Sequence, residues 1–247
     1  MEEQKVDVSV VIPAYREERR IGDTLAAVSS FLSASGSAYE ILVVDDGSPD
    51  GTIRVVEQFR ATREPRIRLL RHPQNRGKGA AVRTGMMAAR GRQILFADAD
   101  NATPIVELQK LQNALQAGAD VAMASRYLSG SNVVLKQPLG RRAMSRVGNL
   151  LFRLVLGLPY ADTRCGFKLF TEGARDRIFP LQTLKRFGFD TEVLVIARRH
   201  GLKMAEVPVE WHDRPNGTIH PWRDSLRSLG EIWKIWKNRW EGKYEKK

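Results

Sequence analysis

The sequence predicts an α/β protein built on a mostly parallel β-sheet, and three observations support that fold class. Short apolar runs rich in β-branched residues alternate with segments of helical periodicity, in the order βαβαβαβ over the first hundred residues. Clusters of glycine, proline, serine and aspartate separate these segments. The chain has 247 residues, of which 43% are hydrophobic, so it can bury a sizeable core. The alternating order predicts parallel strands joined by right-handed helical crossovers.

Strands and helices alternate in the N-terminal half, each between turn signals. The expected strands are apolar runs at residues 6–13, 40–46, 67–72 and 93–97. The expected helices cover residues 17–32, 52–63 and 79–90, and Gly91 ends the last of them. Parallel strands end at the same edge of a sheet, so the loops after residues 13, 46 and 97 should converge on one crevice. Ligands bind at that edge in sheets of this kind.

The C-terminal half is expected to complete the sheet and to add two amphipathic helices. After Pro104 a helix should run to about residue 118, and strands follow at 121–125, 169–170 and 205–211, with a helix at 192–200. Residues 141–158 carry a leucine-rich stripe, and residues 222–240 carry a stripe of tryptophan and leucine. We therefore expect one domain over residues 1–213, followed by a basic amphipathic helix within residues 214–247.

The net charge of +12 is concentrated in two segments. Residues 121–161 contain six Lys or Arg and no acidic residue, and residues 214–247 contain nine Lys or Arg against four acidic residues. A surface of this kind attracts nucleic acid, an anionic membrane face or phosphorylated substrates. The charge accompanies leucine and tryptophan stripes rather than aromatic residues spaced for base stacking. We therefore expect no nucleic-acid partner.

Other features of the sequence predict where in the cell the protein is located. Cys165 is the single cysteine, which excludes an intramolecular disulfide and is typical of a reducing compartment. The N-terminus is charged, unlike a secretory signal, and no run of about 18 apolar residues predicts a transmembrane helix. We expect a cytoplasmic protein whose amphipathic helices attach peripherally to a membrane surface. The alternative is that both helical stripes pack on the core.

The strongest chemical signal is the pair of carboxylates that follows the strand at residues 93–97, in Asp98-Ala99-Asp100. A turn at a strand end can aim both carboxylates into one site. Mg²⁺ and Mn²⁺ prefer oxygen ligands and usually bind one or two carboxylates together with substrate phosphates. Aspartate is also common in turns that bind nothing, so the neighbouring motifs must decide between the two explanations.

Motifs follow one another along the chain as VVIPAYREE at residues 10–18, VVDDGS at 43–48, NRGKG at 75–79 and DAD at 98–100. Together they resemble the family 2 inverting glycosyltransferases, which have the GT-A fold. The later motifs are DADNATP at 98–104, DTRCGFKLF at 162–170, FDTE at 189–192 and EVPVEW at 206–211. These resemble the branch that contains dolichyl-phosphate β-glucosyltransferases and polyprenyl-phosphate glycosyltransferases. The matches extend from about Val8 to Trp211.

The resemblance implies roles for residues of a donor site. Pro13, Tyr15 and Glu17 would line the pocket for the base and ribose, and Asp46 would hold the uracil or ribose edge. Lys78 would face the diphosphate, because the glycines on both sides of it allow a close approach. Asp46 is otherwise part of a turn, and Lys78 is otherwise part of a solvated loop.

The same resemblance separates the two carboxylates of the DAD motif. Asp100 is expected to bind the metal, and Asp98 is expected to support the metal or to bind the ribose. Bound Mg²⁺ or Mn²⁺ would neutralise charge on the leaving diphosphate, so both carboxylates count as catalytic candidates. Mannosyl relatives often carry Gln two residues after the second Asp, where this chain has Ala102. That difference favours glucosyl transfer and leaves a third side-chain ligand open.

The acceptor side is expected to use Asp190 and several basic residues. Asp190 matches the position of a general base in many relatives, and the alternative is a structural acid at a helix start. A polyprenyl phosphate already presents an ionised oxygen, so its attack needs positioning and charge screening more than deprotonation. Guanidinium and ammonium groups bind phosphates. The candidates for that role are Arg126, Arg141, Arg164 and Lys168, each of which is otherwise a surface charge.

The expected function is inverting transfer of a hexose, most simply glucose, from a UDP-sugar to undecaprenyl or dolichyl phosphate at the cytoplasmic membrane face. The expected partners are this nucleotide-sugar donor, the polyprenyl-phosphate acceptor and the membrane surface. The alternatives are GDP-mannose as the donor, a basic nucleic-acid-binding module and a catalytically silent scaffold, against which the intact DAD motif argues. Relatives often carry transmembrane helices, so a membrane-protein partner stays open.

Overall fold

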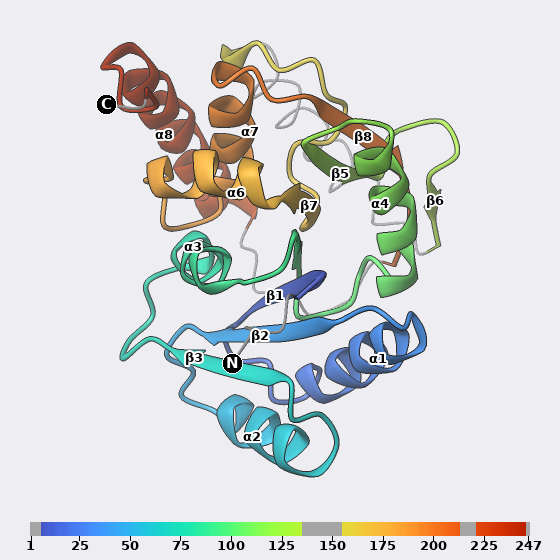
Figure 1. The fold of residues 1–247 in the computed structure, drawn as a ribbon. Helices are drawn as coiled ribbons and strands as arrows, with labels where there is room; N and C mark the ends of the chain where they lie inside the picture. The colour runs from blue at the N-terminus through green and yellow to red at the C-terminus, as the bar shows by residue number, and fades with distance from the viewer. Residues whose placement is uncertain (1–5, 135–154, 213–220, 246–247) are drawn as a thin grey trace.

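The computed structural model describes residues 6–134, 155–212 and 221–245. The candidate phosphate ligand Arg141 and most of the expected helix at residues 141–158 lie outside these residues. The described residues form a seven-stranded sheet with helices on both faces (Figure 1). The α/β class expected from the sequence is therefore confirmed.

The strand order of the main sheet is β3-β2-β1-β4-β7-β5-β8. Its strands are β1 (Val8–Ala14), β2 (Tyr39–Asp45), β3 (Ile67–Arg71), β4 (Gln93–Ala97), β5 (Val121–Ser125), β7 (Phe167–Thr171) and β8 (Met204–Pro208). The first four pair in parallel, as do β5 and β8. Only β7 of this sheet runs antiparallel, between β4 and β5. The sheet is thus mostly parallel, and the start of β7 lies at the edge where its neighbours end.

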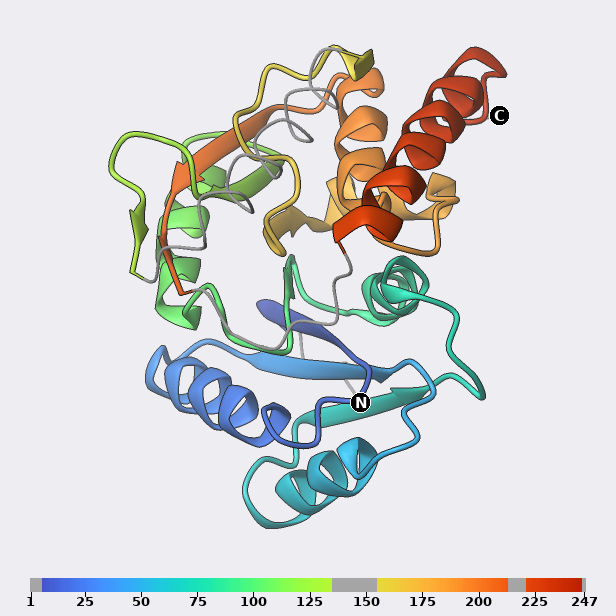
Figure 2. The same cartoon turned by 180° about the vertical axis from the view of Figure 1, so that it is seen from behind.

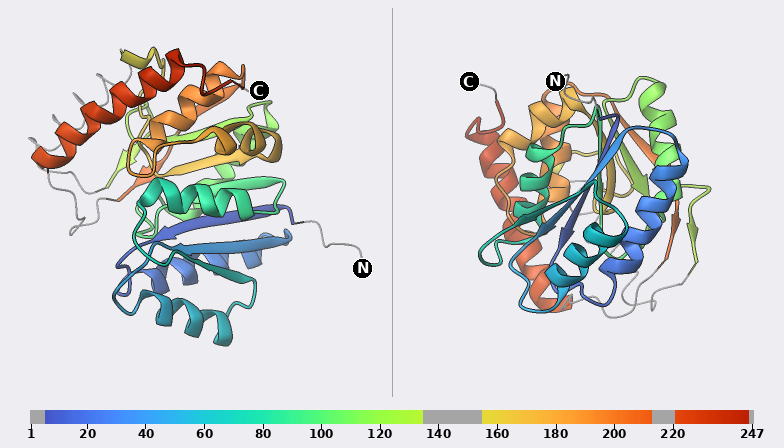
Figure 3. Two further views of the ribbon diagram at one scale, coloured as in Figure 1. Left: turned by 90° about the vertical axis from the view of Figure 1, so that its left-hand side faces the viewer. Right: turned by 60° about the horizontal axis from the view of Figure 1, so that its bottom comes forward.

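The helices form two layers, one on each face of the sheet (Figure 3). Side chains of α1 (Ile21–Ala34), α2 (Thr52–Thr62) and α4 (Leu108–Gln116) join one apolar cluster, together with the 3₁₀ turn η1 (Ile105–Glu107). Side chains of α3 (Lys78–Ala88), α6 (Glu172–Ile178), the 3₁₀ turn η2 (Phe179–Leu181), α7 (Phe189–Arg199) and α8 (Pro221–Trp240) join the other. The buried strands explain why their sequences are nearly continuous apolar runs.

Several boundaries differ from those expected. The strands at residues 93–97 and 121–125 are confirmed, but α7 begins at Phe189 rather than at residue 192, which places Asp190 in its first turn. Helix α6 was not among the expected elements, although the Thr171 hydroxyl accepts a hydrogen bond from the Ala174 N–H as a helix cap. The expected strand at 205–211 is two strands, because the chain leaves β8 after Pro208 and pairs as β9 (Glu210–Trp211) with β6 (Asn132–Val133).

The C-terminal helix α8 packs beside α7 (Figure 2). Ile232, Ile235 and Tyr244 are buried in the same cluster as side chains of α3, α6 and α7. The described part of the segment 214–247 therefore shares a core with the domain of residues 1–213.

The opposite side of α8 carries exposed tryptophans. Trp233, Trp236 and Trp240 are 60%, 49% and 81% exposed. Packing on the core was one of two explanations for the tryptophan stripe. These three side chains are exposed and do not pack on the core. Within the part of the chain that the structure describes, no helix is both long enough and apolar enough to span a bilayer.

Candidate active site

The candidate site lies at the sheet edge where β1, β2, β4 and β5 end. The expected loops all leave from this edge, since β1 ends at Ala14, β2 at Asp45 and β4 at Ala97. The antiparallel β7 begins there as well, with Phe167 opposite Ala97. The loop just before β7 is thereby brought beside the DAD motif.

The DAD motif forms a tight turn after β4. Asn101 has a left-handed backbone with φ of 51°, which asparagine tolerates better than most residues. One oxygen of Asp100 accepts a hydrogen bond from the Ala102 N–H at 3.0 Å. Asp98 lies 2.6 Å from the Lys78 Nζ atom, measured from its Oδ1. The structure therefore brings together Asp98, Asp100 and Lys78, as the sequence predicted.

The electrostatics of these carboxylates fit a divalent cation. Burial raises the pKa of Asp100, and the negative charge of Asp98 raises it further. A bound cation would offset both effects, because it stabilises two ionised carboxylates at once. Among the described residues, no group of three or more His, Cys, Asp or Glu side chains could hold a metal ion. Two carboxylates can hold such an ion together with phosphate oxygens of a substrate, as Mg²⁺ commonly binds, and binding of a metal by Asp98 and Asp100 stays a prediction.

The Asp98 carboxylate occupies the space beside Gly166 because this residue has no side chain. A Cβ atom at residue 166 would lie 2.1 Å from Oδ2 of Asp98, and the Gly166 carbonyl accepts a hydrogen bond from the Asp98 N–H. We expect Gly166→Ala to push the Asp98 carboxylate aside and to lower kcat/KM about tenfold or more, because misplaced catalytic groups lose rate steeply. Steady-state kinetics would measure the loss. Gly173→Ala is the control, since its Cβ would meet no atom within 4 Å. Equal kinetics for both variants would contradict the prediction.

Lys78 is held at the start of α3 by a turn that Asp46 organises. Gly77 has φ of 103°, a conformation that favours glycine. Asp46 is buried, and its carboxylate accepts hydrogen bonds from the N–H groups of Arg76 at 2.9 Å and Gly77 at 2.7 Å. His72 Nδ1 contacts the same carboxylate at 2.7 Å. In this structure Asp46 therefore shapes the turn that carries Lys78, and its contact with a nucleotide stays a prediction.

The charge on Lys78 is favoured by its neighbours. Burial works against the ammonium group, but the carboxylates of Asp98 and Asp190 outweigh it and raise the pKa of Lys78. Lys78 is therefore a cation that faces the site at neutral pH. Such a group screens phosphate charge without donating its proton away.

The three residues expected in the base and ribose pocket lie at the end of β1. Pro13 is buried within β1, and Tyr15 is exposed just after it. Glu17 binds Arg20 through Nε at 2.8 Å and Nη2 at 3.0 Å. Burial raises the pKa of Glu17, and the charges of Asp100 and Asp98 add to this effect. Glu17 therefore faces the same edge as the DAD motif, and its contact with a nucleotide stays a prediction.

Asp190 is buried and paired with Lys168. The Lys168 Nζ atom lies 2.6 Å from Asp190 Oδ1 and also donates to the Cys165 carbonyl. Burial raises the pKa of Asp190, while the charges of Lys168 and Lys78 oppose the rise. Lys168 is thus a buried partner of a carboxylate rather than a solvated surface charge. Charges of Asp98, Lys78, Asp190 and Lys168 alternate in sign through the interior of the site.

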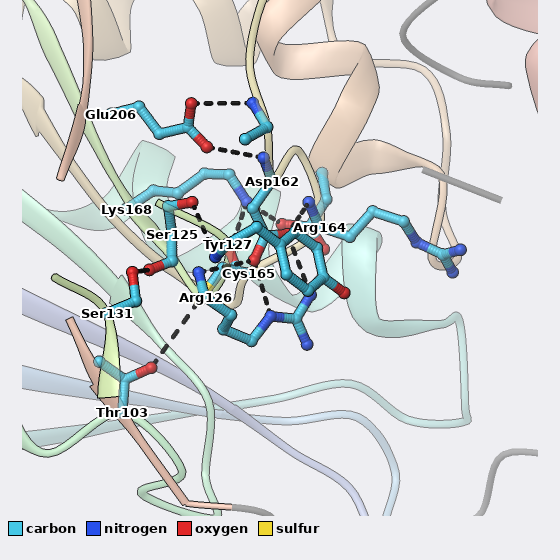
Figure 4. Close-up of polar contacts among 12 residues, drawn as sticks. Thr103, Ser125, Arg126, Tyr127, Ser131, Asp162, Arg164, Cys165, Lys168 and Glu206 are labelled. Carbon is cyan, nitrogen blue, oxygen red and sulfur yellow. Dashed lines mark hydrogen bonds and ion pairs between the residues drawn. The ribbon is translucent and has the colours of Figure 1, made fainter. Parts of the chain in front are cut away.

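Arg126 is held by a carboxylate that was not among the expected site residues. Asp162 is fully buried and binds the Arg126 side chain through Nε at 2.7 Å and Nη2 at 2.9 Å (Figure 4). The Arg164 N–H donates to the same carboxylate, and Glu206 accepts from the Asp162 N–H. The pKa of Asp162 is lowered, because the Arg126 charge and hydrogen bonds outweigh burial.

This arrangement fixes the direction of the Arg126 guanidinium group. Its central carbon lies 5.4 Å from the Tyr127 ring centre and 5.3 Å from that of Trp211. Asp162 belongs to the DTRCGFKLF motif, so its position in that motif was the signal that could have identified it. Binding of a phosphate by Arg126, Arg164 or Lys168 stays a prediction.

Comparison with known proteins shows the family to which this protein belongs. Residues 9–179 match the glycosyl transferase family 2. The chain belongs to the family 2 glycosyltransferases. It is 38% identical to a dolichyl-phosphate β-glucosyltransferase of Trichomonas vaginalis over 220 residues, which are 85% of this chain and 65% of that protein. It is 34% identical to the dolichyl-phosphate β-glucosyltransferase of Drosophila melanogaster over 243 residues, 94% of this chain and 74% of that protein.

Solved structures agree on the fold. Mannosyl-3-phosphoglycerate synthase from Rubrobacter xylanophilus superposes with a TM-score of 0.71 at 20% identity, covering 98% of this chain and 76% of that one. Glucosyl-3-phosphoglycerate synthase from Mycobacterium tuberculosis, in complex with Mn²⁺ and UDP-glucose, gives a TM-score of 0.68 at 19% identity, with 93% and 79% covered. At these identities the likeness concerns the fold.

Proposed function

We propose that this protein transfers glucose, with inversion, from UDP-glucose to a polyprenyl phosphate at the cytoplasmic face of a membrane. The observation that carries the proposal is the contact between Asp98 and Lys78 beside Asp100, which puts two carboxylates and a lysine ammonium group at one strand edge. The relatives named as dolichyl-phosphate β-glucosyltransferases support the choice of sugar and acceptor. The Mn²⁺ and UDP-glucose in a structure of the same fold support a divalent metal.

The residues of the site divide the reaction between them. The acceptor phosphate oxygen forms a bond to the anomeric carbon while the bond from that carbon to the β-phosphate oxygen of UDP breaks. A divalent cation held by Asp98 and Asp100 would stabilise the charge that collects on the leaving UDP. Lys78 adds a second positive charge from the same side. The Asp162-bound Arg126 is a candidate for binding the acceptor phosphate, because its guanidinium direction is fixed.

The acceptor needs little help from a base. A phosphate monoester is ionised at neutral pH, so its oxygen is already a nucleophile. The burial of Asp190 against Lys168 favours a role in arranging charge over proton transfer.

A direct assay tests the function. The enzyme is incubated with Mg²⁺ or Mn²⁺, with undecaprenyl or dolichyl phosphate, and with one donor from a panel that contains UDP-glucose, other UDP-sugars and GDP-mannose. We expect a β-linked glucosyl phospholipid from UDP-glucose, and parallel runs with each metal show which one the enzyme prefers. Product from GDP-mannose alone would assign mannosyl transfer instead. Failure to form a glycolipid with any donor would overturn the proposal.

The exposed tryptophans of α8 are expected to hold the enzyme on a membrane surface. Tryptophan sits favourably at the bilayer interface, and the exposed Lys234 and Lys237 lie on the same helix. We expect the triple variant Trp233→Ser, Trp236→Ser, Trp240→Ser to lower cosedimentation with anionic phosphatidylglycerol vesicles about tenfold. Val106→Ser is the control, because Val106 is an exposed apolar side chain on another face. Unchanged vesicle binding of the triple variant would exclude this surface.

A further inference from the structure

The C-terminal helix is connected to Lys78 through one intervening segment, residues 182–188. This segment lies between η2 and α7. On one side it contacts α8 and Tyr244, which follows α8, and on the other it contacts the turn that carries Lys78. The views in Figures 1 and 2 show α3, α7 and α8 gathered on one face of the sheet.

The contacts on the α8 side are buried hydrogen bonds. Asn238 Nδ2 donates to the Thr183 hydroxyl at 2.9 Å and to the Tyr244 hydroxyl at 3.2 Å. The Tyr244 hydroxyl donates to Glu192 at 2.8 Å, and Glu192 also accepts from the N–H groups of Thr183 and Leu184. Tyr244 and Glu192 are fully buried. Burial makes these bonds expensive to lose, because each unpaired group would be left without water.

Glu231 adds a contact at the other end of the segment. Its carboxylate accepts a hydrogen bond from the backbone of Gly188, the residue just before α7. A Cβ atom at residue 188 would lie 2.9 Å from the Glu231 side chain. Burial raises the pKa of Glu231 despite this hydrogen bond. The segment is therefore held from α8 at its beginning and at its end.

The contacts on the Lys78 side are equally close. The Lys185 carbonyl accepts a hydrogen bond from the Ala80 N–H at 3.0 Å. Gln182 Nε2 donates to the Gly79 carbonyl at 2.8 Å and to the Leu184 carbonyl at 3.0 Å. A Cβ atom at residue 77 would lie 2.4 Å from the Lys185 carbonyl oxygen, so no side chain separates the two backbones. A shift of the segment must therefore displace the residues on both sides of Lys78.

We propose that Asn238, Tyr244 and Glu231 are positioning residues for Lys78, and that the C-terminal helix is thereby a part of the nucleotide-sugar site. They act through segment 182–188, which sets the distance between Lys78 and the Asp98 carboxylate. The inference rests on the proposed role of Lys78 at the donor diphosphate. The inference implies that the affinity for the nucleotide sugar depends on how α8 packs against segment 182–188.

A matched pair of tyrosine variants tests the proposal. Tyr244→Phe removes the hydroxyl that donates to buried Glu192 and keeps the ring. Tyr39→Phe makes the same change at the opposite sheet edge, where the Tyr39 hydroxyl donates to buried Glu64. Thermal unfolding should show comparable destabilisation of both variants. Only Tyr244→Phe should raise the Kd for UDP-glucose in the presence of Mn²⁺, by about three- to tenfold, as measured by titration calorimetry.

A double-mutant cycle tests the connection itself. Gln182→Ala removes the contact with the Gly79 carbonyl, so it should raise the donor Kd, and its effect should be non-additive with that of Tyr244→Phe. The effects of Gln182→Ala and Tyr39→Phe should add. An unchanged donor Kd in folded Tyr244→Phe, or equal increases in both tyrosine variants, would overturn the inference. Wild-type protein that binds no nucleotide sugar would instead overturn the proposed function.

Discussion

Replacing Asp100 with asparagine is expected to lower kcat for glucosyl transfer by about 10²- to 10⁴-fold while the protein stays folded. The amide keeps an oxygen that can accept the Ala102 N–H, so the turn after β4 has no reason to change. The amide lacks the negative charge with which Asp100 would bind the cation. A bound cation contributes several kcal/mol of charge stabilisation in such transfers, and each 1.36 kcal/mol corresponds to a tenfold change in rate.

The measurement is kcat at saturating donor and acceptor over a titration of Mn²⁺. We expect the variant to need more Mn²⁺ and to stay slow at the plateau. Asp120→Asn is the matched control, because the Asp120 carboxylate also accepts one backbone N–H, that of Lys203, at the other end of the sheet. A kcat for Asp100→Asn within a few-fold of that of the control would show that Asp100 does not bind the catalytic metal.

The sheet, and the edge at which β1, β2 and β4 end, were predictable because the sequence patterns that indicate strands and turns are local. An apolar run between turn residues predicts a buried strand, and the strands at 93–97 and 121–125 have the expected bounds. The order of strands and helices then fixes which loops share an edge. For this reason the loops that follow β1, β2 and β4 were expected at one edge, whereas the place of Lys78 beside Asp98 followed only from the family resemblance.

The remaining features depend on contacts between distant residues. From the sequence, Lys168 was expected to be an exposed charge. Nothing in the sequence around Lys168 indicates that Asp190 forms an ion pair with it inside the protein. Asp162 lies in a recognised motif, but only the fold shows that its partner is Arg126, 36 positions away. The tryptophan and leucine stripe of residues 222–240 left two explanations open, packing on the core and contact with a membrane. Periodicity identifies a helix face but does not show what covers it. The buried Ile235 and Tyr244 show which side of this segment meets the core.

Breaking the buried pair between Lys168 and Asp190 is expected to cost about 3–5 kcal/mol of stability in either single variant. Lys168→Met leaves the buried carboxylate without its nearest cation, and Asp190→Asn leaves the buried ammonium without its carboxylate. For a chain of this size each kcal/mol corresponds to about 2–4 °C in Tm, so calorimetry should show a large decrease. The double variant Lys168→Met, Asp190→Asn should recover much of the loss, because it leaves neither charge unpaired.

The double variant also separates the two explanations of Asp190. If the carboxylate arranges charge beside Lys78, the folded double variant should keep kcat within about tenfold of the wild type, because an ionised lipid phosphate needs no base. If Asp190 is a general base, kcat should fall by at least about 10²-fold while UDP-glucose binding is retained, and the acidic limb of the pH–rate profile should disappear. The control is the double variant Arg68→Met, Glu40→Gln. It removes another ion pair, which joins β3, an outer strand of the sheet, to β2. Because Glu40 and Arg68 lie near the beginnings of β2 and β3, whereas the DAD motif follows the end of β4, removal of this pair should lower Tm and leave kcat unchanged.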